Sequence, residues 1–82
     1  MEADKIFESL KFEKLNSPLL NYFEYNQTSK DETATISFDC NSKTIMGALY
    51  IGNNFESRGL ALTVPEIKAI YKKCEELGWI DE

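Results

Sequence analysis

The chain has 82 residues, with 14 acidic and 9 basic side chains, no histidine and a formal net charge of −5 at pH 7. Typical domains hold roughly 100 to 150 residues, so we expect one small domain over residues 1–82. Hydrophobic residues make up 43% of the chain, which excludes a disordered protein. Phosphates repel an acidic surface, so the charge disfavours direct binding to nucleic acid.

The chain opens with an acidic segment, MEADKIFESL, and nowhere contains the run of about 18 apolar residues that spans a bilayer. Its two cysteines, Cys40 and Cys74, are far apart and belong to no CxxC motif. We interpret both as reduced structural thiols, with a Cys40–Cys74 bridge left open, because small secreted domains usually carry several disulfides. These features predict a cytoplasmic protein that does not contact a membrane.

The first predicted element is a helix over residues 3–15. Ala3, Ile6, Phe7 and Leu10 recur at helical spacing. The pattern weakens after Leu10, and Asn-Ser-Pro at residues 16–18 ends it, because a residue that precedes proline is disfavoured in the helical conformation.

Three strands are predicted next, over residues 19–27, 33–40 and 44–52, joined by polar turns at 28–32 and 41–42. The second strand alternates strictly, which predicts a sheet with one wet face and antiparallel pairing. The third is apolar on both sides, which indicates a central strand or one partly covered by the N-terminal helix. Residues 60–62 are a candidate for a brief fourth strand.

The last predicted element is a helix that begins after Thr63 and ends before Gly78. Thr63 and Glu66 have the spacing of a capping box, and Gly78 suits the left-handed residue that closes a helix. Its apolar residues follow a spacing of three and four and are predicted to enter the core: Ile67, Ile70, Tyr71, Cys74 and Leu77.

Together these elements predict an α+β two-layer domain. It contains an N-terminal helix, a three- to four-stranded antiparallel meander and a C-terminal helix packed on the sheet. No enzymatic chemistry is predicted from the same residues. Histidine, the commonest catalytic base and a frequent metal ligand, is missing, and the four glycines are scattered singly rather than gathered in a phosphate loop. We therefore expect no catalytic residue, no cofactor and no metal site.

Two groups of apolar residues are candidate protein-binding surfaces. Tyr22, Tyr25 and Tyr50 supply large contact areas with polar tips, if the sheet leaves one face uncovered. The alternative is that the N-terminal helix covers that face. At the other end of the chain, Trp79 and Ile80 either pack back on the helix or the sheet edge or anchor a partner, which makes a homodimer possible.

The acidic residues are a third candidate surface. Asp31, Glu32 and Asp39 lie in or beside predicted turns, and Glu75 and Glu76 lie near the C-terminus. Spaced carboxylates can imitate the phosphates of DNA and occupy the groove of a DNA-binding protein. They also form an ordinary solvated face that keeps a small protein soluble.

A pattern near the C-terminus resembles small uncharacterised proteins of Gram-positive phages and mobile elements. It consists of Leu62, Thr63, Glu66, Ile67, Ala69, Ile70 and residues 76–79. The resemblance assigns no function to any residue, but it makes small acidic inhibitors of defence nucleases a class to consider.

The leading functional hypothesis is a non-enzymatic cytoplasmic interaction or accessory module that binds a protein partner of unknown identity. The alternative is an acidic inhibitor that imitates nucleic acid and blocks a DNA-binding or defence protein. The two differ in their response to salt, because binding through charge weakens steeply with ionic strength and binding through apolar contact does not.

Overall fold

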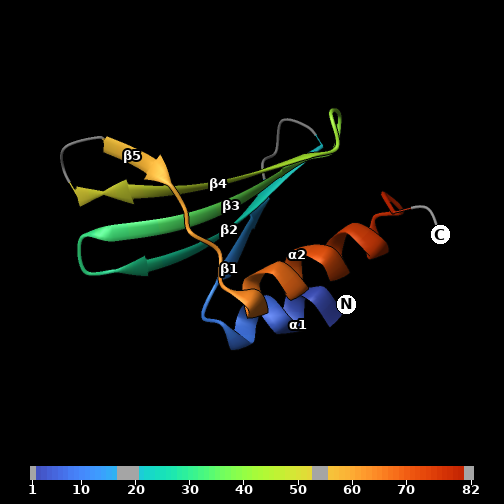
Figure 1. Cartoon of the computed structure of the whole chain (residues 1–82), viewed down its shortest axis with the longest axis horizontal. Coiled ribbons are helices and arrows are strands. Elements are labelled where there is room, and N and C mark those ends of the chain that lie inside the picture. Colours follow the sequence, from blue (N-terminus) through green and yellow to red (C-terminus); the bar gives the residue numbers. More distant parts are fainter. Residues whose placement is uncertain (1, 17–20, 53–55, 81–82) are drawn as a thin grey trace.

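A computed structural model describes residues 2–16, 21–52 and 56–80 of the chain. Five antiparallel strands form one sheet in the order β1-β2-β3-β4-β5, and both helices lie side by side on the same face of it (Figure 1). The predicted α+β layout is confirmed, but the sheet has five strands instead of three to four. In chain order the elements are α1 (Glu2–Ser9), β1 (Glu13–Asn16), β2 (Tyr22–Ser29), β3 (Glu32–Asp39), β4 (Thr44–Ile51), β5 (Glu56–Gly59) and α2 (Val64–Glu76).

Helix α1 is shorter than predicted, because the backbone of Lys11 takes a left-handed conformation with φ of 71°. The amide of Lys11 donates to the Glu8 carbonyl, and the amide of Phe12 donates to the Phe7 carbonyl. This pair of bonds is a Schellman motif, the usual glycine-closed end of a helix, built here on a lysine. The motif turns Phe12 back onto Phe7, with ring centroids 5.8 Å apart, so the helix ends at Ser9.

The two additional strands lie at the edges of the sheet. Strand β1 pairs with β2, and strand β5 pairs with β4. Each has four residues, all of them exposed, so neither shows the alternation of apolar residues by which a strand is predicted from sequence. The brief strand predicted at residues 60–62 is wrong, because pairing with β4 occurs just before it, at Glu56–Gly59.

The hydrophobic core lies between the sheet and the two helices. Phe7 of α1 stacks on Tyr25 of β2 with ring centroids 3.8 Å apart, and Phe38 of β3 stacks on Phe23 at 4.9 Å. Alternation along β2 and β3 turns these aromatic residues toward the helices and leaves their neighbours on the other face. Both cysteines are free thiols that pack on this core.

Helix α2 begins and ends as predicted. Thr63 and Glu66 form both hydrogen bonds of a capping box. At the other end Gly78, with φ of 75°, closes a second Schellman motif, in which the Trp79 amide donates to the Cys74 carbonyl. With 13 residues in α2 and 8 in α1, neither described helix is long and apolar enough to span a membrane.

The buried side of α2 differs from the prediction. Cys74 is buried, and Ile70 and Leu77 pack against the core, but Ile67 and Tyr71 are more than half exposed. Ala69 and Lys73 are buried instead. The reason is that α1 packs against α2 from one flank, which draws the residues of that flank out of solvent and leaves the opposite flank outside the core.

Candidate functional site

The face of the sheet opposite the helices, called the open face below, is covered by no described element. In the register of β2, β3 and β4, every second side chain points to this face. It combines hydroxyl, amide and carboxylate groups with exposed apolar residues. The three central strands contribute Tyr22, Glu24, Asn26, Thr28, Thr33, Thr35, Ser37, Asp39, Thr44, Met46, Ala48 and Tyr50.

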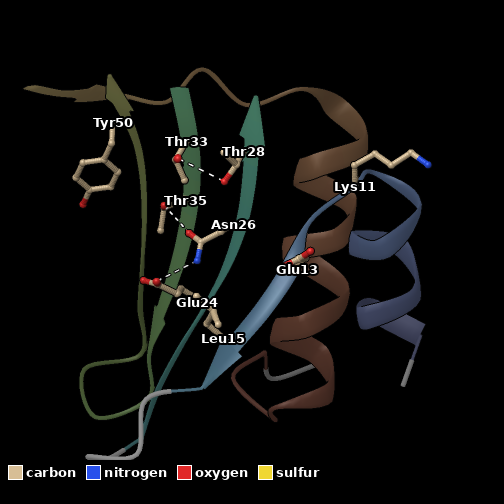
Figure 2. Close-up of a pocket in the computed structure, with 9 residues that line it drawn as sticks. All are labelled: Lys11, Glu13, Leu15, Glu24, Asn26, Thr28, Thr33, Thr35 and Tyr50. Atoms are coloured by element: carbon tan, nitrogen blue, oxygen red, sulfur yellow. Dashed lines mark hydrogen bonds between the residues drawn. The ribbon is translucent and has the colours of Figure 1, made fainter. Parts of the chain in front are cut away.

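The open face is concave. It holds a hollow of about 630 Å³, with Tyr50 of β4 on one side and Lys11 and Glu13 on the other (Figure 2). Strand β1 lines the hollow as well, because it pairs with the outer edge of β2 and places Glu13 and Leu15 over the same face. A smaller hollow of about 170 Å³ adjoins it at Tyr50 and extends to Met46 and Asp39.

Hydrogen bonds along β2 and between β2 and β3 hold the floor of the hollow in place. Thr35 donates to the Asn26 side-chain oxygen at 2.6 Å, and the Asn26 amide donates to Glu24 Oε1 at 3.1 Å (Figure 2). The other carboxylate oxygen of Glu24 accepts a bond of 3.0 Å from the Tyr22 hydroxyl. Side chains fixed in this way lose little further entropy when a partner docks on them.

Large apolar side chains stand around this polar floor. Met46 is 65% exposed and Tyr50 is 48% exposed, and Tyr22 and Leu15 are exposed beside them. Tyrosine and methionine are enriched at the centres of protein interfaces, because they offer large contact areas at small cost in conformational entropy. The predicted aromatic surface therefore exists for Tyr22 and Tyr50.

The prediction for Tyr25 is wrong, because this residue lies on the helix-covered face and is 1% exposed. Its hydroxyl donates to Asp4 Oδ1 at 2.5 Å. Burial, followed by this hydrogen bond, raises the pKa of Tyr25. Tyr25 is three residues from Tyr22 in sequence, so within one strand the two must point to opposite faces. This spacing could have separated them from the sequence, but which of the two is exposed depends on the face that the helices cover.

The C-terminal candidates are half-buried. The Trp79 ring lies 6.2 Å from the Phe38 ring, and both Trp79 and Ile80 pack on the edge of the core. This is the alternative in which the tail packs back on the fold, and the ring that Trp79 meets belongs to strand β3 of the sheet. Most of the Trp79 and Ile80 side chains is therefore buried in the fold. The open face exposes more apolar surface than these two residues do.

The candidate acidic residues do not form one array. Glu32 and Asp39 stand at opposite ends of β3, about 23 Å apart at the usual rise per residue. Glu75 pairs with Lys72 on the helix layer, and Glu76 accepts a hydrogen bond from the Ala3 amide at 3.0 Å. Only Asp39 of these residues lies on the open face, beside Tyr22 and Met46.

Sequence reasoning missed a charged cluster that joins the two helices to the sheet. Lys73 Nζ lies 3.3 Å from Asp4 Oδ1 and 3.9 Å from Glu76 Oε1, and it stands 5.3 Å above the Phe23 ring. Lys14 Nζ of β1 lies 3.8 Å from the other carboxylate oxygen, Asp4 Oδ2. Burial alone would raise the pKa of Asp4, but hydrogen bonds from Tyr25 and Lys73 and the charges of both lysines outweigh it and lower the pKa.

This cluster is interpreted as structural. Its two lysines, Lys14 and Lys73, form ion pairs with Asp4 and Glu76, and these contacts tie the helices to the sheet. Burial raises the pKa of the Cys74 thiol, which disfavours the reactive thiolate. Within residues 2–16, 21–52 and 56–80, no group of three acidic or cysteine side chains is arranged to hold a metal ion.

Comparison of the chain with protein-family models, curated proteins and solved structures finds no match. What the protein does is therefore inferred from the chemistry of the open face.

Proposed function

We propose that the chain is a non-enzymatic protein-binding module that docks a partner on its open face. The observation that carries this proposal is the exposure of Tyr22, Met46 and Tyr50 on a concave sheet face that no described element covers. Apolar groups grouped on one face of a small protein mark interaction surfaces, whereas isolated ones do not. Of the predicted binding residues, we propose Tyr22 and Tyr50 as partner contacts. Tyr25, Trp79 and Ile80 pack in the hydrophobic core or at its edge.

A protein partner fits this face better than a small molecule. The exposed apolar residues run from Leu15 on β1 to Tyr50 on β4, across four strands that span about 15 Å at the usual spacing. Small molecules are normally bound in enclosed clefts that bury most of their surface. A broad face with a polar floor and an apolar margin is instead the usual anatomy of a protein interface.

The acidic side chains of the open face favour a partner with basic side chains. Glu13 and Glu24 line the hollow, and no described lysine or arginine lies within ion-pair distance of either carboxylate. Lys11 is the single cation among the lining residues. A lysine or arginine side chain from the partner would complement this hollow, whereas a second copy of the same face would bring acidic groups together.

The test is an affinity capture from a nuclease-treated lysate of the source organism with three matched baits. The baits are the wild-type chain, the open-face variant Tyr22→Ser/Tyr50→Ser, and the control variant Tyr71→Ser, which removes an equally exposed tyrosine from α2. A specific protein held by the wild type and the control but lost from the open-face variant supports the proposal. A protein held equally by all three baits contradicts it.

Washes at about 100 mM and about 500 mM salt distinguish apolar partner binding from the alternative function, an acidic inhibitor that imitates nucleic acid. The Debye length falls from about 10 Å to roughly 4 Å between these conditions, so a contact made only through charge is weakened. We expect the partner to survive the second wash because of the tyrosine and methionine contacts. A partner released by salt and displaced by added DNA would favour an acidic inhibitor instead.

A further inference from the structure

The outer edge of β5 pairs with no described strand. Figure 1 shows β5 at the border of the sheet, on the side away from both helices. All four of its residues, Glu56–Gly59, are exposed. A strand at the border of a sheet presents backbone amides and carbonyls that can pair with another strand. The edge is therefore a candidate seam for a strand from a second molecule.

Hydrogen bonding with β4 decides which backbone groups of β5 point outward. The Leu60 amide donates to the Gly47 carbonyl at 3.4 Å, which continues the pairing of β5 with β4 by one residue. Along an antiparallel strand, the backbone groups of successive residues alternate between bonding to that neighbour and pointing away from it. Glu56 and Arg58 therefore bond to β4, and the amide and carbonyl of Ser57 point outward.

The side chains of Glu56 and Arg58 place opposite charges on one side of β5. The two residues are two apart in the strand, so they point to the same side of the sheet, whereas Ser57 points to the other. Neither forms an ion pair with the residues that the structure describes. Lysines commonly protect an edge against pairing, because they repel a second copy of the strand. Opposite charges at this spacing instead complement a second copy.

One twofold register of two β5 strands pairs these charges. In a twofold antiparallel pair, the residue on the axis faces its own copy. With Ser57 on the axis, Glu56 of each copy faces Arg58 of the other, at positions where opposite side chains lie closest. With Glu56 or Arg58 on the axis, two like charges would face each other directly, which is unfavourable.

We propose that a second copy of this chain pairs its β5 antiparallel with this edge, in a twofold dimer with Ser57 on the axis. The outward amide and carbonyl of each Ser57 bond to Ser57 of the other copy, and a Glu56–Arg58 pair flanks them on either side. Each pair takes its anion from one copy and its cation from the other, so the contact is self-complementary, as a twofold interface requires. The two five-stranded sheets then continue as one.

This dimer is independent of the proposed partner binding. The twofold axis is perpendicular to the joined sheet, so both open faces lie on the same side of it and neither is covered. The seam of two short strands is smaller than a standard interface, so we expect a dissociation constant near the millimolar range. Either proposal can fail while the other holds, because the changes at Tyr22 and Tyr50 leave the edge of β5 intact.

Sedimentation equilibrium of the full chain between about 50 µM and 2 mM, at about 50 mM salt, tests the dimer. We expect the mass to rise from 9.4 kDa toward twice that value with concentration. Arg58→Glu should keep the wild-type circular dichroism spectrum and weaken the dimer roughly tenfold, because Glu56 of each copy then faces a carboxylate. The matched control, Lys68→Glu on α2, makes the same change in net charge away from the edge and should dimerise as the wild type does.

The charge exchange Glu56→Arg/Arg58→Glu tests the pairing itself. This double variant should restore the dimer, because it reverses both charges of each pair. A wild-type chain that stays at 9.4 kDa at the highest concentration would overturn the proposal. Equal weakening in Arg58→Glu and Lys68→Glu, or a double variant as weak as Arg58→Glu, would overturn it as well.

Disulfide trapping tests the register. Facing residues on the axis have Cα atoms about 5.5 Å apart, within reach of a disulfide, so Ser57→Cys should form a covalent dimer in glutathione disulfide. The two copies of residue 58 would lie about 8 Å apart, beyond that reach, so Arg58→Cys should remain at the level of the wild type, which controls for the native thiols. Faster trapping of Arg58→Cys than of Ser57→Cys, or no trapping of Ser57→Cys above the wild type, would contradict the proposed seam.

Discussion

Lys73 of α2 and Asp4 of α1 form a charged contact at the boundary between the two helices, with Nζ 3.3 Å from Oδ1. Lys73 is 4% exposed, and its amine stands 5.3 Å above the Phe23 ring. A buried ammonium group is stable only when its lost hydration is replaced. Here the replacement comes from Asp4, from Glu76 and from the face of Phe23, so one side chain links α1, α2 and β2.

We predict that Lys73→Met destabilises the protein although methionine fits an apolar site. The change removes the buried cation that pairs with both Asp4 and Glu76. One oxygen of the Glu76 carboxylate is already buried without a hydrogen bond. The expected loss in the free energy of unfolding is about 2 to 4 kcal/mol, measured by urea denaturation. Lys72→Met, which removes a solvent-exposed amine on the next position, should leave the free energy unchanged within error; an equal loss in both variants would contradict this interpretation.

The pH dependence of stability should report on Asp4. Its pKa is lowered in the folded protein, so the unfolded chain takes up a proton first as the pH falls. The stabilisation from ionised Asp4 is therefore complete above the unfolded value of about 3.9 and is lost as the pH falls through the lower folded value. Urea denaturation between pH 2 and 7 should show a shallower decline below pH 4 for Asp4→Asn than for the wild type, and parallel curves would exclude Asp4 as a source of the decline.

We predict opposite effects for two substitutions at the left-handed residues that close the helices. Lys11→Gly should stabilise the protein by about 0.5 to 1 kcal/mol, because glycine adopts positive φ without the penalty that lysine incurs. Gly78→Ala, at φ of 75°, should destabilise it by about 1 kcal/mol for the same reason. Thermal denaturation measures both, and a destabilised Lys11→Gly variant would mean that the lysine side chain contributes more than its backbone costs.

Aromatic residues of the core and of the open face should respond differently to truncation. Trp79→Ala removes a ring that packs against Phe38 and should cost about 3 kcal/mol of stability. Tyr50→Ala removes an exposed ring, and its effect should stay within about 0.5 kcal/mol. Denaturation of the two variants in urea distinguishes them. If Tyr50→Ala proved as costly as Trp79→Ala, Tyr50 would belong to the fold and would be a poor choice for a partner contact.

Features that depend on residues close together in the chain were predicted well. The capping box of Thr63 and Glu66, the stop at Gly78 and the alternation along β3 each require only a few neighbouring residues, and the structure contains all three. The end of α1 is also local, but it was missed because the left-handed residue is Lys11, a residue type that carries no signal for that conformation.

The features that define the candidate surfaces depend on tertiary structure. Strands β1 and β5 exist through backbone pairing with β2 and β4, and their side chains are too exposed to leave a pattern in the sequence.

The amphipathic pattern of each helix predicts that one side of the helix is buried. It does not predict which face of the sheet the helix covers. By itself, the sequence determined an acidic α+β protein, both ends of α2 and the alternation of β3. Packing of α1 beside α2 on one face then decided the rest: it left Tyr22, Met46 and Tyr50 uncovered on the other face, and it left Ile67 and Tyr71 on the outer flank of α2. The physical reason is that burial is shared between elements far apart in the chain, so which apolar residues remain exposed is decided only when those elements meet.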